Sequence, residues 1–238
     1  MNKYWDWGFF FEILPRILEG AVRTVIAALG GYALAVVGGL LVALLLFALK
    51  PSTQVVESET TVRVKRFLTF VVKEIVEFIR STPLLIQVFF IFYVGPQFGI
   101  TLSPWTAGLL AISLHYTAYL SEVFRGGLEA VPKGQWEASI SLSLSPMHTF
   151  FRIITPQAII PSIGGLGNYL IGIFKDTPML SAIAVMEMMF MANAIGGEHY
   201  RYTEPYTLVG AIFLIVSLPM AGFIRAFERF VRRKMGLA

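Results

Sequence analysis

The chain has 238 residues, of which 56% are hydrophobic and 14% charged, against about 45–50% and about 25% in an ordinary soluble domain. This composition argues against a soluble fold, and a run of 26 residues from Thr24 to Leu49 carries no charge at all. The absence of cysteine excludes disulfides, thiolate metal sites and cysteine nucleophiles. In so apolar a chain, the net charge of +4 indicates which loops stay in the cytoplasm rather than a nucleic-acid partner.

The N-terminal end combines aromatic residues with balanced charges. Residues 1–23 contain Trp5, Trp7 and three consecutive phenylalanines, which is typical of an amphipathic segment on the membrane surface; a frayed terminus is the alternative. The uncharged run that follows exceeds the roughly 20 residues that a spanning helix needs. It is also too long for a signal-peptide core, so we expect a retained first span over 24–49.

The middle of the chain holds the second, third and fourth stretches that are apolar enough to form spans. After a polar loop over 51–66, we expect a second span over 76–95 that carries Glu77 and Arg80 near its cytoplasmic end. An uncharged loop leads to a third span over 105–122. The fourth apolar segment, 156–190, contains three prolines and several glycines, so we expect one span together with a kinked or partly unwound section.

The C-terminal part predicts a loop over 193–205, a fifth span over 206–226 and a basic tail. Residues 50–80, 121–152 and 225–238 hold 14 of the 19 Lys and Arg residues. Because positive charges concentrate in cytoplasmic loops, five spans place the N-terminus outside and the C-terminus inside. The prediction is one all-helical transmembrane domain over residues 1–238.

The polar loop over 130–152 is the most informative segment. Pro132 is placed as a first-turn residue, and the residues after it can form a short surface helix. Ser145 before Pro146 predicts an N-cap with proline at the first position of a new helix. A short helix held on the cytoplasmic face suits docking of a soluble partner, whereas an ordinary amphipathic loop is the alternative.

A spaced motif runs through this loop into the fourth apolar segment. Glu137-Ala138-Ser139 is followed after three residues by Ser143 and after nine more by Ile153, Ile154, Thr155 and Pro156. This run resembles the EAA motif of permease subunits in bacterial ATP-binding-cassette importers. Ser139 stands for the second alanine, Ser143 for glycine and Thr155 for leucine, while the spacing is intact.

The resemblance covers nearly the whole chain, and the chain is similar to the polar amino-acid branch of these permeases. It rests on Arg80-Ser81-Thr82-Pro83, Gly134-Gln135-Trp136-Glu137-Ala138, Pro156-Gln157-Ala158 and Lys175-Asp176-Thr177. Within that branch, the chain is most like ectoine and hydroxyectoine permeases, on the runs Phe78-Ile79-Arg80-Ser81-Thr82-Pro83, Leu114-His115-Tyr116 and Arg201-Tyr202-Thr203-Glu204-Pro205.

The resemblance implies a fold and a set of partners. The fold is that of a type I importer permease, with five transmembrane helices and an EAA coupling helix between spans three and four, in the bacterial inner membrane. The partners are an ABC ATPase dimer, a second permease that is identical or homologous, an extracytoplasmic solute-binding protein and membrane lipid. The candidate contacts of the binding protein in the last outer loop are Glu198, His199, Arg201 and Glu204.

The same resemblance assigns roles in coupling to the ATPase. Glu137 is expected to make polar contacts, Ala138 to permit close approach, and Ser143 to stiffen or strain a turn where glycine is usual. The full set of predicted coupling residues is Gly134, Glu137, Ala138, Ser139, Ser143 and Pro156.

Charged residues inside apolar segments are candidates for a substrate pathway. An ionised side chain in a membrane costs on the order of 2.5–3.5 kcal/mol, so Lys175 and Asp176 should face the bundle interior or water. A zwitterionic solute presents both charges, and we place Asn168 and Glu187 with them as pathway candidates. Packing of Lys175 with Asp176, or an interfacial place for Glu187, is the alternative. His115 is a further pathway candidate, although packing is the favoured interpretation over a proton relay.

Several other functions have little support in the sequence. There is no phosphate-binding loop of the G-x-x-x-x-G-K-[ST] type, so ATP is expected to be used by a partner and no cofactor to be bound directly. The nine methionines indicate packing rather than a metal site. Three histidines without cysteine are thin material for an intramembrane enzyme. We therefore expect an importer subunit for a polar amino acid or ectoine-like solute, with an ion-coupled secondary transporter of a small zwitterion as the alternative.

Overall fold

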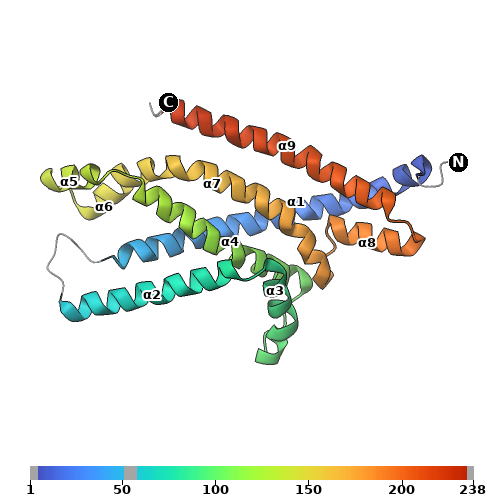
Figure 1. Ribbon diagram of the computed structural model, residues 1–238, viewed down its shortest axis with the longest axis horizontal. Helices are drawn as coiled ribbons and strands as arrows, with labels where there is room; N and C mark the ends of the chain where they lie inside the picture. Colours follow the sequence, from blue (N-terminus) through green and yellow to red (C-terminus); the bar gives the residue numbers. More distant parts are fainter. Residues whose placement is uncertain (1–4, 51–57, 235–238) are drawn as a thin grey trace. The chain divides into compact units, whose positions relative to one another are not determined.

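The structure, a computed structural model, describes residues 5–50 and 58–234, and every regular element among them is helical (Figure 1). The predicted all-helical class is confirmed. The α-helices are α1 (Trp7–Ala48), α2 (Glu59–Ser81), α3 (Leu84–Phe89), α4 (Pro104–Glu129), α5 (Lys133–Ser141), α6 (Pro146–His148), α7 (Thr155–Asp176), α8 (Met188–His199) and α9 (Thr203–Lys234). Wider π-turns form η1 (Phe90–Val94) and η3 (Thr149–Ile154), and tighter 3-10 turns form η2 (Gly95–Phe98) and η4 (Thr177–Ile183).

Three of the described helical stretches are long and apolar enough to cross a membrane: Trp7–Ala48, Pro146–Ile183 and Thr203–Arg233. The number rises to four if α2 and Leu84–Phe98 are counted as one broken span. The count of five spans stays a prediction.

Helix α1 begins earlier than the predicted first span. It starts at Trp7, so most of the segment predicted to lie on the membrane surface is continuous with the span that follows it. The carboxylate of Asp6 accepts hydrogen bonds from the amides of Gly8 and Phe9, at 2.9 and 3.2 Å, and thereby satisfies donors that a helix start leaves unpaired. Residues 1–4 of that segment lie outside the described residues.

The predicted polar loop and second span also differ from the structure. Helix α2 begins at Glu59, where Ser58 accepts a hydrogen bond from the amide of Thr61, while residues 51–57 lie outside the described part. The helix ends because Thr82 precedes Pro83 and takes an extended conformation, with φ −107° and ψ 139°. The segment 76–95 is therefore divided at Thr82–Pro83 instead of forming one uninterrupted helix.

Both π-turn segments end two residues before a proline. η1 ends at Val94 before Pro96, and η3 ends at Ile154 before Pro156. A proline lacks the amide proton of the helical ladder, and its ring collides with the carbonyl four residues earlier. The wider turns accommodate this loss without ending the helical path.

The fourth apolar segment consists of a long helix and an unwound section, as its prolines and glycines predict. Helix α7 passes into η4, Ala184 adopts a left-handed conformation with φ 61°, and α8 starts at Met188. The loop predicted over 193–205 is shorter in the structure, because α8 continues to His199 and α9 begins at Thr203. The predicted basic tail is, up to Lys234, the end of α9.

The chain divides into two compact units, and the single domain expected from the sequence stays a prediction. Unit 1 comprises Met1–Leu34, Pro83–Ser113 and Tyr169–Phe223, and unit 2 comprises Ala35–Thr82, Leu114–Asn168 and Ile224–Ala238. Each unit is assembled from three separate chain segments, and the long helices run from one unit into the other. No linker marks such a division in the sequence.

The core of unit 1 forms where α1, α8 and α9 meet around the buried side chains of Ile17, Met188 and Ile195. Thr24 of α1 joins α8 through two hydrogen bonds: it donates to the Glu187 carboxylate at 3.3 Å and accepts from the amide of Met188 at 3.1 Å. A side chain at Gly20 would place its Cβ 2.7 Å from the Met188 Cα, so glycine is what allows these helices to touch.

Glycines set the closest helix contacts in unit 2. A Cβ at Gly39 of α1 would lie 2.8 Å from Leu120 of α4. A Cβ at Gly127 of α4 would lie 2.5 Å from the carbonyl oxygen of Ala158 in α7. Small residues permit this approach, which gives van der Waals packing where lipid removes the hydrophobic drive for helices to associate.

The adjacent glycines of α4 provide a direct test of this packing. Gly127→Ala should lower the free energy of unfolding by about 1–3 kcal/mol, because a backbone carbonyl has to move. Gly126→Ala should be neutral or stabilising by up to about 1 kcal/mol, since a Cβ there meets nothing within 4 Å. Thermal unfolding of the purified protein in detergent measures both, and equal effects of the two substitutions would contradict the close contact.

Candidate functional site

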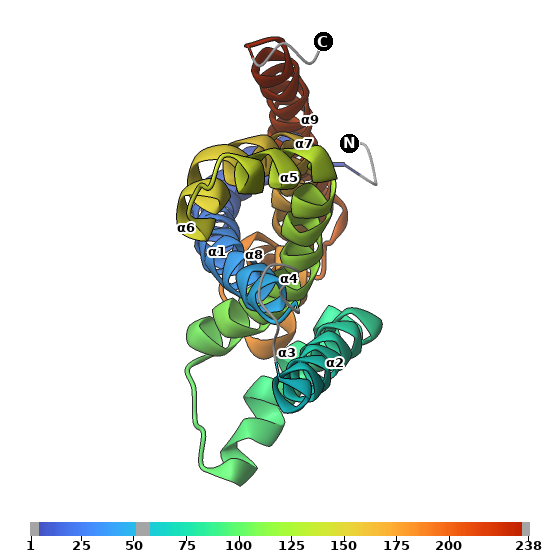
Figure 2. The same ribbon diagram turned by 90° about the vertical axis from the view of Figure 1, so that its left-hand side faces the viewer.

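The short helix predicted in the loop over 130–152 is present as α5 (Lys133–Ser141). Pro132 lies just before the helix rather than in its first turn, with φ −56° and ψ 137°. Helix α6 begins as predicted, with Ser145 accepting a hydrogen bond from the amide of His148 at 3.3 Å and Pro146 at the first position. Figure 2 looks onto the end of unit 2 at which α5 and α6 lie.

Aromatic stacking fixes α5 against the end of α1. The rings of Trp136 and Phe47 are stacked at 5.4 Å between centroids with 28° between their planes. Phe47 also contacts the ring of Phe150 at 5.0 Å. Trp136 further packs on the buried Val131 and Ile154, so α5 is joined to the end of α1, to η3 and to the start of α7.

The EAA residues divide between the two faces of α5. Glu137 and Ala138 are exposed, whereas Ser139 is buried and donates a hydrogen bond to the carbonyl of Gln135 at 2.8 Å. Gly134 is exposed as well. A small side chain at Ser139 suits the inner face, and the outer face presents a carboxylate beside a methyl group.

Three apolar side chains in α5, in the turn after it and in α6 are also exposed. Ile140, Leu142 and Met147 are 47, 71 and 69% exposed. In a region predicted to face the cytoplasm, exposed apolar side chains are typical of a protein-binding surface.

Ser143 adopts the conformation for which the motif normally supplies glycine. Its φ is 54°, in the left-handed region. Its amide donates to the carbonyl of Ile140 at 2.8 Å, and the amide of Leu144 donates to that of Ser139 at 3.1 Å. These two bonds form a Schellman motif with Ser143 at the position that glycine usually occupies. Pro156, the last predicted coupling residue, is the second residue of α7.

The predicted pathway residues fall into both units. His115 of α4 and the exposed Asn168 of α7 belong to unit 2; the His115 ring is buried, 5.0 Å from that of Tyr119. The exposed Lys175 and the half-buried Asp176 form the last turn of α7 in unit 1. Their role in a pathway stays a prediction.

Glu187 has the contacts of a helix cap. Its side chain is fully buried and accepts a hydrogen bond from the amide of Phe190 at 2.7 Å as well as the bond from Thr24. These contacts close the start of α8, and they give Glu187 a structural task beside its predicted place in the pathway.

Three of the four residues predicted to face a binding protein form ion pairs in unit 1. Arg16 donates two hydrogen bonds to Glu198, at 2.7 and 3.0 Å, and these bonds lower the pKa of that carboxyl. Arg201 pairs with Asp6 and with Glu204, and its guanidinium lies 4.9 Å from the Phe9 ring centre. The His199 ring lies 5.0 Å from that of Phe9. Glu204 is buried, so Glu198, His199 and Arg201 remain the more accessible candidates.

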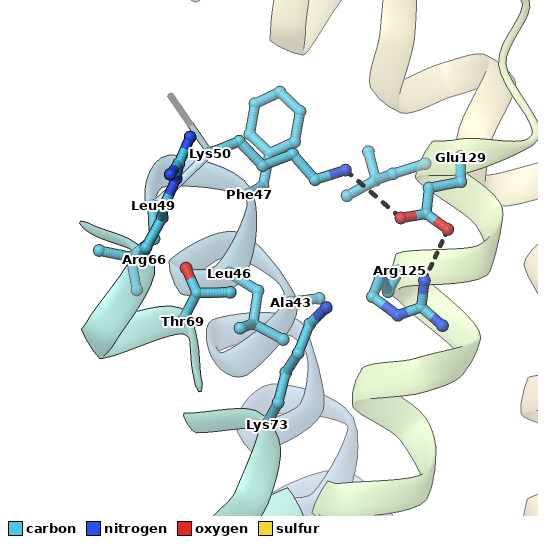
Figure 3. A pocket seen from close by; sticks show the side chains of 11 residues that line it. Ala43, Leu46, Phe47, Leu49, Lys50, Arg66, Thr69, Lys73, Arg125 and Glu129 are labelled. Carbon is cyan, nitrogen blue, oxygen red and sulfur yellow. Dashed lines mark hydrogen bonds and ion pairs between the residues drawn. The ribbon is translucent and has the colours of Figure 1, made fainter. Parts of the chain in front are cut away.

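An ion-pair network beside α5 was not predicted. Glu129 of α4 accepts hydrogen bonds from Lys50 at 3.3 Å and from Arg125 at 2.6 Å (Figure 3). Arg125 also pairs with Glu122 at 2.6 Å. Burial raises the pKa of Glu129, but the hydrogen bonds and charges of Arg125 and Lys50 outweigh it and lower that pKa. The spacing of Arg125 from the two glutamates signals their pairing on a helix, whereas nothing in the sequence links Lys50 or Phe47 to α4 or α5.

Comparison with known proteins finds a family and close relatives. The family of binding-protein-dependent transport system inner membrane components matches residues 55–233. A probable amino-acid ABC transporter permease protein, y4tG of Sinorhizobium fredii (strain NBRC 101917 / NGR234), is 39% identical over 94% of this chain and 93% of its own. The L-cystine transport system permease protein TcyB of Bacillus subtilis (strain 168) is 38% identical over 71% of this chain and 74% of its own.

Solved structures share the fold. A chain from a crystal structure of an amino acid ABC transporter with histidines has a TM-score of 0.82 and 29% identity, covering 94% of this chain and 98% of its own. A chain of the inward-facing MetNI methionine ABC transporter has a TM-score of 0.75 over 92% of this chain and 98% of its own, and with 18% identity it shows the fold alone.

The left-handed serine yields a test of the turn after α5. Ser143→Gly should stabilise the protein by about 1 kcal/mol, because glycine adopts positive φ without steric cost. Ser141→Gly, two residues earlier and within the helix, should destabilise it by about 0.5–1 kcal/mol. Thermal unfolding and amide hydrogen exchange of α5 measure both changes. Destabilisation by Ser143→Gly would show that this residue does not hold the left-handed turn.

Proposed function

Because this chain belongs to the family of binding-protein-dependent transport system inner membrane components, we propose that it is the membrane subunit of an ATP-driven importer for a polar amino acid or an ectoine-like zwitterion. The fold class is confirmed as that of a type I importer permease. The proposal includes transport by alternating access. It also includes three partners, which are an ATPase, a second permease and a solute-binding protein.

The observation that carries the proposal is the exposed Glu137–Ala138 pair on a helix held from behind by the Trp136–Phe47 stack. A docking helix transmits motion only if it is fixed to the elements that have to move. Here α5 contacts the end of α1, η3 and the start of α7. Closure of an ATPase dimer around the outer face of α5 would therefore displace those helices with it.

The charges support one orientation. Glu137, the basic residues of α2 and the arginines at the end of α9 lie in segments that the positive-inside rule assigns to the cytoplasm. The Arg16–Glu198 pair and the Arg201 cluster then lie outside, where a binding protein delivers its solute. We place the N-terminus outside and the C-terminus inside the inner membrane.

The substrate class is supported by the relatives. Those described above are a probable amino-acid permease and an L-cystine permease, and an arginine permease, ArtQ of Escherichia coli (strain K12), is also similar. A zwitterion requires one cationic and one anionic partner, and the end of α7 offers Lys175 beside Asp176. An ectoine-like solute meets the same charge requirement. Nothing in the comparisons favours the ion-coupled alternative.

Reversing the charge of Glu137 tests the coupling role. Glu137→Arg should weaken association with the co-expressed ATPase roughly ten- to hundredfold, because hydrogen bonds to a charged group are lost. Glu74→Arg makes the same change at an exposed glutamate of α2 and should leave association intact. Co-purification from detergent-solubilised membranes, followed by mass spectrometry, measures both. Retention of the ATPase by Glu137→Arg would contradict the role given to α5.

Removing the charge of Asp176 tests the pathway. Asp176→Asn should raise the KM of solute uptake roughly tenfold with little change in the amount of ATPase bound, since a charge-assisted contact with the solute is lost. Proteoliposomes with the complete transporter and a panel of arginine, cystine and ectoine provide the assay and identify the solute. An unchanged KM would assign Asp176 to packing.

A further inference from the structure

A cavity of about 250 Å³ lies in unit 2 where the end of α1 faces α2 and α4 (Figure 3). Its apolar wall comes from Ala43, Leu46, Phe47, Leu49 and Leu128. Its charged residues are Lys50, Arg66, Lys73, Arg125 and Glu129. Phe47 also stacks on Trp136 of α5, but none of the predicted coupling or pathway residues lines this cavity.

The lining of the cavity is mainly positive, because it contains four cationic side chains and one carboxylate. Glu129 is engaged by Lys50 and Arg125, and Arg125 is further held by Glu122. Arg66 and Lys73 on α2 face the same space, and neither has a carboxylate partner among residues 5–50 and 58–234. These two cations are left to receive an anion.

The surface beside the rim is suited to hydrocarbon. Phe67, Phe70 and Phe78 of α2 are 65, 58 and 69% exposed. Phe70 lies one helical turn from Arg66 and one turn from Lys73. The exposed phenylalanines, which form an apolar flank of α2, therefore begin next to these two cations. A ligand that fills the cavity and this flank needs an anionic head and an apolar tail.

We propose that this cavity binds the phosphodiester headgroup of an anionic phospholipid from the cytoplasmic leaflet, with Arg66 and Lys73 as its principal cationic contacts and the acyl chains along α2. Basic pockets between membrane helices on the cytoplasmic side suit such headgroups. The leaflet rests on the orientation in the proposed function, whereas the chemistry of the cavity does not. Inorganic phosphate shares the charge but leaves the apolar wall and flank uncovered.

The test is lipid binding to the purified full-length chain in neutral detergent, counted by native mass spectrometry. Phosphatidylglycerol should bind in preference to phosphatidylcholine. The double substitution Arg66→Gln with Lys73→Gln should weaken binding of phosphatidylglycerol roughly 30-fold, and Arg66→Lys with Lys73→Arg should retain it. Arg63→Gln with Lys65→Gln removes two cations from the same helix outside the lining and should have a far smaller effect.

Four results would overturn the proposal. The first is equal binding of the two lipids, and the second is an equal loss of binding in the cavity variant and in the Arg63/Lys65 control. The third is displacement of phosphatidylglycerol by inorganic phosphate at matched concentration. The fourth is loss of the lipid when the chain joins the complete transporter. The third result makes soluble phosphate the ligand, and the fourth makes a protein subunit the occupant. The first three results come from the isolated chain without ATPase, nucleotide or solute, and the fourth needs assembly but no transport, so failure of lipid binding is separate from a failure of the proposed transport function.

Discussion

The structure depends on the requirement that backbone amides and carbonyls find partners within the chain, because the hydrocarbon of a membrane offers them none. Helices meet that requirement internally, and the difficult positions are where a helix starts or breaks. Side-chain oxygens close several of these starts, among them those of Asp6, Ser58, Ser145 and Glu187. Before Pro96 and Pro156, widened π-turns take over where the proline removes a donor. The places where the chain departs from regular helix are therefore specified by individual residues.

The predicted coupling helix, α5, also depends on contacts made by individual residues. Helix α5 is only nine residues long, and a helix of that length is marginal in water unless tertiary packing supports it. The Trp136–Phe47 stack, the buried Ser139 and the Schellman turn at Ser143 provide that support. Glu137 and Ala138 remain on the opposite face, where they are exposed. Support on one face and exposure on the other suit a helix that passes motion from a soluble subunit to a membrane one.

Local signals in the sequence predict some features and miss others for identifiable reasons. Composition predicts the helical membrane class, Ser145–Pro146 predicts the start of α6, and the prolines predict an unwound section after α7. The start of α2 at Glu59 is missed because its amphipathic, charged turns look like a loop when judged by hydropathy alone. The Phe47–Trp136 contact joins residues far apart in the chain, and no local pattern indicates such a pair.

In the candidate site, too, the sequence predicts some features and misses others. The motif predicts the coupling residues, and the serine in place of glycine predicts a strained turn. The φ of Ser143 is positive, as such a turn requires. Whether a polar residue lines a pathway or closes a helix is decided by its neighbours. Glu187 illustrates this, since its burial and its bonds to Thr24 and Phe190 depend on where α1 crosses α8. A charge within an apolar stretch is compatible with both tasks.

The contact proposed between α5 and the ATPase can be tested by cross-linking. The chain contains no cysteine, so Ala138→Cys introduces a single thiol on the exposed face of α5. With a short thiol–thiol cross-linker and a cysteine in the docking surface of the ATPase, intact membranes should yield a cross-linked pair whose amount changes with ATP. Tyr200→Cys, at a residue 90% exposed on the side assigned to the outside, should yield none. Cross-linking at residue 200 but not at residue 138 would contradict both the orientation and the role of α5.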